Sequence, residues 1–183
     1  MKRMIDDIAE VFFSAEELEE VTSRIGAEIS RDYEGKELLL ICVLKGSVMF
    51  MSDLMKHITI PVEIDFLAAE SYGSSTKSSG EVRITKDINT DIRGKHVVIV
   101  EDILDSGRTL HKLTQFLGMK DPESIAICTL LDKPDRREAE VKAKYIGSRV
   151  KDEFVVGYGL DYDQKYRNLP FIGVLKKEVY EKG

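Results

Sequence analysis

Apolar residues recur at helical spacing near the start of the chain. Ser14-Ala15-Glu16-Glu17 forms a capping box, in which serine and glutamate side chains satisfy free backbone donors at the start of a helix. The apolar positions that follow it are Leu18, Val21, Ile25 and Ile29. This pattern predicts a helix over about residues 14–30, with one face against a core.

The next segment changes from strand-like to helical spacing. Residues 38–44 form a nearly unbroken apolar run, which is typical of a strand buried on both faces. A turn at Lys45-Gly46 leads into an amphipathic segment through Leu54 and Met55. We therefore expect a strand, a turn and a helix in this part of the chain.

The same alternation returns in the middle of the chain. Apolar strands are expected at 97–100 and 124–131. The helix between them has apolar residues at helical spacing, namely Leu110, Leu113, Phe116 and Leu117. Repeated strands and amphipathic helices predict an α/β fold with a mainly parallel sheet flanked by helices, and ligands of such folds bind beyond the carboxyl ends of the strands.

Two regions depart from this alternation. Strands at 60–69 and 81–85 flank a segment that is too small and polar to pack, which predicts a flexible hairpin tip over about residues 70–81. From residue 132 onward the expected strands are short, at 141–145, 154–158 and 171–175, and charged loops separate them. We expect a small C-terminal lobe, mainly over 132–183, on a single domain that spans residues 1–183.

Composition excludes several classes of protein. The chain is 43% hydrophobic and 33% charged, as in ordinary globular proteins. No apolar run is long enough to span a bilayer and the start is charged, so we expect a cytoplasmic protein with no membrane partner. A net charge of −6, with acids and bases interleaved, argues against a nucleic-acid partner and suits a small polar ligand with a metal ion. Cys42 and Cys128 lie in apolar runs, where we expect inert core thiols.

The richest chemistry follows the strand expected at 97–100. Three carboxylates and a small-residue loop gather there: Glu101, Asp102, Asp105, Ser106, Gly107, Arg108 and Thr109. Gly107 lets the loop curl so that free N–H groups of a helix beginning near Thr109 converge on one anion, and Ser106 adds a hydroxyl donor. Glu101 and Asp102 could accept hydrogen bonds from vicinal hydroxyls or position magnesium through water. The combination indicates a ribose 5-phosphate site.

Simpler roles account for only part of this segment. Asp105 or Ser106 could merely cap the following helix, but a cap explains one acid and not three. The chain contains no GxxxxGK[ST] sequence, and Gly157-Tyr158-Gly159 lacks the third glycine of GxGxxG. Neither a P-loop nor a dinucleotide-binding fold is supported.

The acidic turn closely resembles the phosphoribosyl pyrophosphate signature of the type I phosphoribosyltransferase family. Further segments resemble its hypoxanthine (guanine) group in the same order: Val43-Leu44-Lys45-Gly46-Ser47, Ser71-Tyr72-Gly73, Leu131-Asp132-Lys133-Pro134 and Phe154-Val155-Val156-Gly157-Tyr158-Gly159-Leu160-Asp161-Tyr162, with Arg167 after them. The resemblance covers nearly the whole chain. It implies the type I fold with a flexible lid and a base-binding hood. It also implies Mg2+-dependent transfer of the phosphoribosyl group from phosphoribosyl pyrophosphate to hypoxanthine or guanine, giving IMP or GMP in purine salvage.

The resemblance implies roles for the residues on the phosphoribosyl pyrophosphate side. Glu101 and Asp102 would hold the ribose hydroxyls and magnesium, and residues 105–109 would hold the 5-phosphate. Asp105 would also be the catalytic residue, acting as general acid/base at purine N7. Leu44-Lys45-Gly46 would form the pyrophosphate loop, with a strained peptide before the lysine, and Arg167 would add a second pyrophosphate contact.

The resemblance also implies how the base is recognised. Lys133 would donate to the 6-oxo group, which explains why adenine should be refused. Phe154 would stack on the ring, the Val155 backbone would read the base edge, and Asp161 would bind a second magnesium. Taken singly, Phe154 is as typical of a core aromatic and Asp161 of a turn cap. The joint pattern favours function.

A lid and self-association are implied in the same way. Ser71 and Tyr72 would belong to a lid that closes over the site and excludes water, although a simply disordered segment fits the composition equally well. The family's habit of association implies a homodimer or homotetramer.

Two alternative functions compete with this one. A phosphoribosyl pyrophosphate-sensing regulator that binds nucleic acid is expected to carry a helix-turn-helix extension or a basic stripe, and the sequence has neither. A sibling enzyme could use xanthine, adenine or uracil; Lys133 and residues 154–161 argue against the last two and leave xanthine open.

Overall fold

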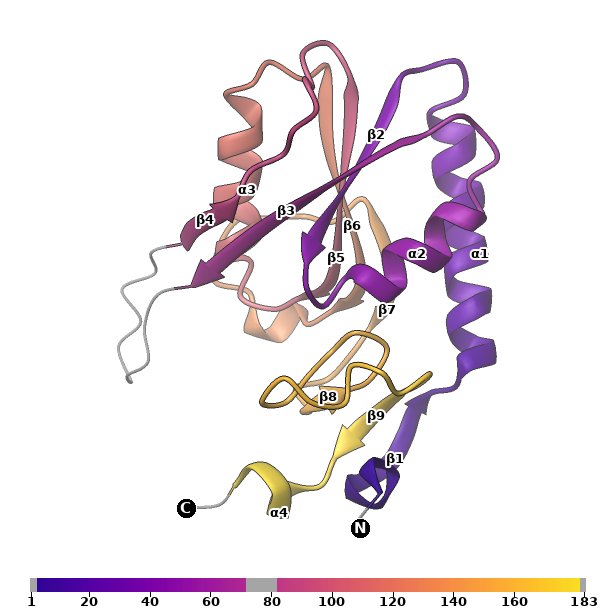
Figure 1. Ribbon diagram of the computed structural model, residues 1–183, viewed down its shortest axis with the longest axis vertical. Helices are drawn as coiled ribbons and strands as arrows, with labels where there is room; N and C mark the ends of the chain where they lie inside the picture. The colour runs from indigo at the N-terminus through magenta and orange to yellow at the C-terminus, as the bar shows by residue number, and fades with distance from the viewer. Residues whose placement is uncertain (1–2, 72–81, 182–183) are drawn as a thin grey trace.

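A computed structural model describes residues 3–71 and 82–181 (Figure 1). The larger sheet has six strands in the order β4-β3-β2-β5-β6-β7, and β4 alone among them is antiparallel to its neighbour. Its strands are β2 (Leu38–Leu44), β3 (Glu63–Ser71), β4 (Val82–Lys86), β5 (His96–Leu104), β6 (Ser124–Asp132) and β7 (Tyr145–Arg149). The predicted α/β fold with a mainly parallel sheet is confirmed.

Helices cover both faces of this sheet. α1 (Ala15–Asp32) and α2 (Val48–Lys56) lie on one face and α3 (Arg108–Gly118) on the other, as Figure 1 shows. Alternate residues of β2 enter the two cores, with Leu40 facing α1 and α2 and Ile41 facing α3. The strand is therefore buried on both faces, as its apolar run predicts. The capping box at Ser14 is also present, since Ser14 and Glu17 exchange side-chain and backbone hydrogen bonds.

The two buried cysteines behave as predicted. Cys42 and Cys128 are free thiols in the core between the sheet and α1. Burial raises the pKa of Cys42 to about 12, so the thiol is protonated and unreactive at neutral pH. No helix in the described ranges is both long and apolar enough to cross a bilayer.

The order of the strands determines where a ligand can bind. The chain passes from β2 through α2 to β3 on one side, and from β5 through α3 to β6 on the other. Neighbouring strands β2 and β5 are parallel, so their carboxyl ends lie at the same edge of the sheet, and the connections that follow them lead in opposite directions. In open α/β sheets such a reversal of strand order forms the crevice where ligands bind.

A second, smaller sheet lies beyond this edge. It has the antiparallel order β1-β9-β8, formed by β1 (Ile8–Phe13), β8 (Val155–Val156) and β9 (Ile172–Leu175), and Figure 1 shows it below the carboxyl ends of β2 and β5. We call this sheet and its loops, residues 3–13 and 150–181, the hood. Short helical segments complete the fold: η1 (Met4–Asp7), η2 (Pro134–Arg136) and α4 (Lys177–Tyr180).

Three predictions about strands need correction. The strand expected at 141–145 is wrong: β7 begins at Tyr145 and joins the larger sheet, while Val141 and Ala143 pack on its α3 face without pairing. The apolar residues in this segment belong to a loop that packs against the sheet. The loop first returns from the carboxyl end of β6 to its amino end, and only then can β7 pair in parallel with β6. The second correction concerns β1, which the sequence did not reveal because its pairing partner β9 is distant in sequence.

The third correction concerns β5. The strand expected at 97–100 continues to Leu104, because β5 pairs with β6 as far as Leu104 and Asp132. Glu101 and Asp102 therefore lie on the strand and not in a turn after it. The predicted pairing of β3 with β4 is confirmed, with Ser71 opposite Val82, so residues 70 and 71 belong to β3 and not to the flexible tip predicted over about residues 70–81. Residues 72–81 of that tip, including Tyr72, lie outside the described residues.

Candidate active site

Two adjoining cavities lie where β2, β5 and the hood meet. The first, of about 470 Å³, is lined by the ends of β2 and β5 and by the loop before α3. The second, of about 570 Å³, lies between that loop, the segment after β6 and the hood. Asp102, Ile103, Asp105 and Asp161 line both. A ligand with two chemically different halves could occupy the pair of cavities.

Two adjacent carboxylates on β5 form the floor of the first cavity. The buried Ser47 at the start of α2 holds them: its Oγ donates to Oε1 of Glu101 (3.2 Å) and accepts from the backbone N–H of Asp102 (3.0 Å). Burial raises the pKa of both carboxyl groups, and the neighbouring Asp102 raises the pKa of Glu101 further. A cation bound here would restore the charged forms.

The surroundings of Asp102 fit a magnesium ion. A Cβ on Gly46 would lie 1.7 Å from Oδ2 of Asp102, so glycine leaves the space that this carboxylate occupies. Mg2+ is usually held by one or two carboxylates together with water and substrate phosphates. The described residues contain no cluster of three or more metal-ligating side chains.

Asp161, the third predicted metal ligand, has other partners. Its Oδ1 lies 2.9 Å from Nη2 of Arg167, and its Oδ2 accepts from the backbone N–H of Gln164 at 2.8 Å. Asp161 lines the same cavity as Glu101 and Asp102 but does not form one cluster with them.

The loop before α3 has the shape of an anion cradle. Gly107 is the N-cap of α3 and has φ 79°, which lets the loop curl as the sequence predicts. Ser106, Gly107 and Thr109 line the first cavity. Arg108 is not among the residues that line it, and its guanidinium forms an ion pair with Glu138. The N–H groups of the first turn of α3, of which that of Arg108 donates to Oγ of Ser106 at 3.5 Å, and the two hydroxyls can therefore bind a phosphate.

Two cations lie at the opposite wall of this cavity. Nζ of Lys45 and Nη2 of Arg167 each donate to Oε1 of Gln164, both at 3.3 Å. The peptide bond between Leu44 and Lys45 is cis. Two positive side chains next to Gly46 provide a site for a polyanion.

The hood contacts the segment around Lys45 and Gly46 directly. Nη1 of Arg167 donates to the carbonyl of Gly159 at 2.7 Å, and the Gly159 N–H donates to the carbonyl of Arg167 at 3.0 Å. A Cβ on Gly159 would lie 1.9 Å from the carbonyl oxygen of Gly46. The two predicted pyrophosphate segments are thus in contact, although they are far apart in the sequence.

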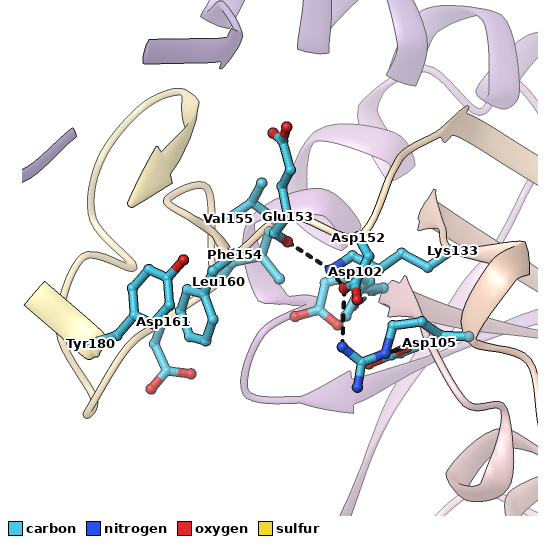
Figure 2. Close-up of a pocket in the computed structure, with 12 residues that line it drawn as sticks. Asp102, Asp105, Lys133, Asp152, Glu153, Phe154, Val155, Leu160, Asp161 and Tyr180 are labelled. Carbon is cyan, nitrogen blue, oxygen red and sulfur yellow. Dashed lines mark hydrogen bonds and ion pairs between the residues drawn. The ribbon is translucent and has the colours of Figure 1, made fainter. Parts of the chain in front are cut away.

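The second cavity presents one polar and one aromatic wall. Figure 2 shows Lys133 and Asp105 on one side and Phe154 on the other. Lys133 is only 7% exposed, and its Nζ donates to the carbonyl of Glu153 at 2.7 Å and lies 3.5 Å from Oδ1 of Asp152. A buried ammonium group facing a cavity can donate to an acceptor on a ligand.

The aromatic wall is a stack of rings. Phe154 is 38% exposed, so it is not a core aromatic, and that alternative for this residue is not supported. Its ring stacks on Tyr180 of α4, with centroids 4.9 Å apart, and meets Tyr162 edge to face at 5.6 Å. Val155 follows on β8 and lines the cavity. A flat base could stack on the Phe154 ring.

Several residues at the site were not singled out from the sequence: Ser47, Ile103, Arg136, Asp152, Leu160, Gln164 and Tyr180. Ser47 and Leu160 lie inside family motifs, so the resemblance carried a signal for them. Tyr180 had none, because only folding brings the end of the chain against Phe154.

Known proteins are similar to this chain over most of its length. The family model of the phosphoribosyl transferase domain matches residues 13–163. The hypoxanthine-guanine phosphoribosyltransferase of Staphylococcus aureus is 50% identical over 177 residues, covering 97% of this chain and 99% of that protein. The enzyme of the same name from Streptococcus thermophilus is 49% identical over 176 residues, covering 96% and 98%.

Solved structures give the same result. A crystal structure of a hypoxanthine phosphoribosyltransferase from Staphylococcus aureus superposes with a TM-score of 0.94 at 50% identity, covering 97% of this chain and 96% of that one. A hypoxanthine-guanine phosphoribosyltransferase from Bacillus anthracis, with HEPES in its active site, superposes with a TM-score of 0.89 at 48% identity and covers 92% and 99%.

Proposed function

The chain belongs to the phosphoribosyltransferase family, and we propose that within this family it is a purine-salvage enzyme. It transfers the 5-phosphoribosyl group of phosphoribosyl pyrophosphate to hypoxanthine or guanine, or to both, giving IMP or GMP and pyrophosphate. The observation that carries this proposal is the pair of adjoining cavities with Asp105 between them. One cavity would bind the phosphorylated sugar, and the other would bind the 6-oxopurine.

The first cavity would hold phosphoribosyl pyrophosphate along its whole length. Residues 105–109 would bind the 5-phosphate through backbone N–H groups and hydroxyls, and Glu101 and Asp102 would accept from the ribose hydroxyls. Magnesium held by these two carboxylates would supply positive charge to the leaving group. Lys45 and Arg167 lie where they would bind the pyrophosphate as it departs.

The second cavity would select and orient the base. Lys133 would donate to the 6-oxo group, the Val155 backbone would bind the base edge, and Phe154 would stack on the ring. In the reaction, purine N9 bonds to C1 of the ribose as the bond from C1 to the pyrophosphate oxygen breaks. Asp105, which borders both cavities, would hold or accept the proton at N7 as the charge on the purine changes.

Adenine carries an amino donor where hypoxanthine and guanine carry the 6-oxo acceptor. It would leave the buried Lys133 ammonium facing another donor, which is strongly unfavourable. Xanthine keeps the 6-oxo group, so Lys133 does not reject it. A lid that includes Ser71 and Tyr72, a second magnesium at Asp161, and assembly as a homodimer or homotetramer stay predictions from the family resemblance.

The decisive experiment supplies the protein with magnesium, phosphoribosyl pyrophosphate and one base at a time: hypoxanthine, guanine, xanthine, adenine or uracil. We expect nucleotide and pyrophosphate in equal amounts from hypoxanthine, guanine or both, none from adenine or uracil, and no product when EDTA removes the metal. Chromatography separates the nucleotides. Failure to form nucleotide from any base, together with no binding of phosphoribosyl pyrophosphate in calorimetry with Mg2+, contradicts the proposal.

A further inference from the structure

Arg136 lies in the base cavity but belongs to neither the phosphate-binding nor the base-binding groups. It is the last residue of η2 and lines the second cavity beside Lys133. Its Nε lies 3.0 Å from Oδ1 of Asp105, and its Nη1 donates to Oδ1 of Asp152 at 3.0 Å. Oδ1 of Asp105 is buried and accepts no hydrogen bond from the described residues, so Arg136 is its neighbouring positive charge.

These contacts form a chain of alternating charges. Asp105 is followed by Arg136, then by Asp152, whose Oδ1 lies 3.5 Å from Nζ of Lys133. Figure 2 shows three of its members, Asp105, Asp152 and Lys133, on one side of the cavity, and Arg136 also lines this cavity. Its two ends are the groups proposed to contact N7 and O6 of the purine. These atoms lie on the same edge of the base, so the spacing between the two ends must match that edge.

The backbone fixes Arg136 relative to both ends. The Lys133 N–H donates to the carbonyl of Leu104 at 2.9 Å, which ties the start of η2 to the end of β5 next to Asp105. The Arg136 N–H donates to the carbonyl of Lys133 at 3.2 Å, and Pro134 restricts the turn between them. The segment that supplies the base-reading lysine thus also supplies the arginine that contacts Asp105.

We propose that Arg136 is a positioning residue for the 6-oxopurine: it holds one oxygen of Asp105 and, through Asp152, the Lys133 ammonium, so that both groups meet one edge of the base. This inference rests on the proposed function. A planar guanidinium presents donors on two edges and can bridge two carboxylates, which the single ammonium of lysine does less well. With one oxygen of Asp105 held by Arg136, the other is left for the base.

A simple surface ion pair would have different consequences. Arg136 and Asp152 are half-exposed, and exposed ion pairs contribute little to stability. A positioning role instead predicts an effect on use of the base, with little effect on folding or on phosphoribosyl pyrophosphate. It also predicts that a change at Arg136 affects use of the base only when Asp105 is present.

A double-mutant cycle tests this dependence. Arg136→Gln, Asp105→Asn and the double variant are compared by kcat and KM for hypoxanthine at saturating phosphoribosyl pyrophosphate, and by calorimetric binding of phosphoribosyl pyrophosphate with Mg2+. Arg136→Gln is expected to lower kcat/KM for hypoxanthine by about 5- to 30-fold, and binding of phosphoribosyl pyrophosphate should stay within about 2-fold. In the Asp105→Asn background the same change should have less than about a 3-fold effect.

Three further variants sharpen the result. Arg136→Lys keeps the charge but not the bridge, so it should recover only part of the loss. Asp152→Asn removes the negative charge between Arg136 and Lys133. It should lower kcat/KM for hypoxanthine by a smaller factor than Arg136→Gln does. Arg31→Gln is the matched control, because this exposed arginine lies 3.6 Å from Asp32 on α1, outside both cavities, and should behave as wild type.

The possible failures are distinguishable. Wild-type turnover by Arg136→Gln, an equal loss in the Asp105→Asn background, or an equal loss of phosphoribosyl pyrophosphate binding overturns the positioning role while the proposed function stands. If the wild-type protein makes no nucleotide, the proposed function fails and the inference fails with it. Thermal unfolding of each variant identifies a loss that comes from misfolding, and that result also counts against a positioning role.

Discussion

The two halves of the site are built in different ways. The phosphoribosyl half takes its groups from the ends of β2 and β5, strands that are buried in the sheet and paired on both sides. The base half takes most of its groups from the two-residue strand β8 and from loops in which non-glycine residues such as Tyr158 and Gln164 have positive φ. Under the proposed function, the sheet would hold the sugar phosphate and the attached lobe would read the base.

Specific contacts join the two halves at their junction. Gly159 packs against Gly46, and the hydroxyl of Tyr158 in the hood donates to Oδ2 of Asp53 on α2 at 2.6 Å. Changes in either half should therefore affect one substrate, while changes at the junction should affect both. Asp105 is an exception, because it is one of the four residues that line both cavities.

The largest effect is expected at Asp105. Asp105→Asn keeps the size of the side chain and loses the proton acceptor, so turnover should fall by roughly 10² to 10⁴ while phosphoribosyl pyrophosphate still binds. Steady-state nucleotide formation and calorimetry with Mg2+ measure the two quantities. Turnover near that of wild type would contradict the role as general acid/base.

The junction between the halves comes next. In Gly159→Ala the new Cβ would lie 1.9 Å from the carbonyl oxygen of Gly46, at a position with φ 99°. We expect the free energy of unfolding to fall by roughly 2–4 kcal/mol and the KM values of both substrates to rise. Gly118→Ala, where no atom lies within 4 Å of the new Cβ, is the matched control and should be nearly neutral. A change in only one KM would count against a shared junction.

Lys133→Ala separates the halves most clearly. Loss of a charged donor to the 6-oxo group should lower kcat/KM for hypoxanthine by roughly 10- to 100-fold. Binding of phosphoribosyl pyrophosphate should change little, because Lys133 lines only the second of the two cavities. Lys151→Ala, at an exposed lysine nearby in the chain, serves as control. An equal loss for both substrates would show that Lys133 supports the whole site.

The smallest effect concerns how the hood is held at low pH. Burial alone would raise the pKa of Asp53, but hydrogen bonds from Lys56 and Tyr158 outweigh it and lower the pKa below its ordinary value. The contact therefore stabilises the fold above the ordinary carboxyl pKa, and this contribution is lost as the pH falls through the folded-state pKa. Tyr158→Phe should lower the free energy of unfolding by about 0.5–1.5 kcal/mol at neutral pH.

Urea unfolding at a series of pH values checks this prediction. The difference between wild type and Tyr158→Phe should shrink as the pH falls below about 4. Tyr180→Phe removes a hydroxyl from a residue that stacks on Phe154 through its ring, so it should show no such pH dependence. A difference that is constant with pH would mean that the Tyr158 hydroxyl does not stabilise the fold through ionised Asp53.

The sequence predicted best what depends on local pattern. The capping box at Ser14, the apolar run of β2 and the glycine before α3 each dictate structure through their own residues and near neighbours. The same holds for the phosphate loop, because a strand, a turn with Gly107 and a helix start suffice to expose N–H groups to an anion. The order of the family motifs extended the prediction to the residues proposed to bind the base.

Tertiary structure alone decided the rest, because it depends on contacts between distant segments. β1 becomes a strand by pairing with β9, and Tyr180 reaches the base cavity by stacking on Phe154. The chain of charges through Arg136 likewise exists only once η2 is tied to the end of β5. Local sequence determined the sugar-phosphate site through backbone geometry, whereas long-range packing determined how the hood and the residues around the base come together.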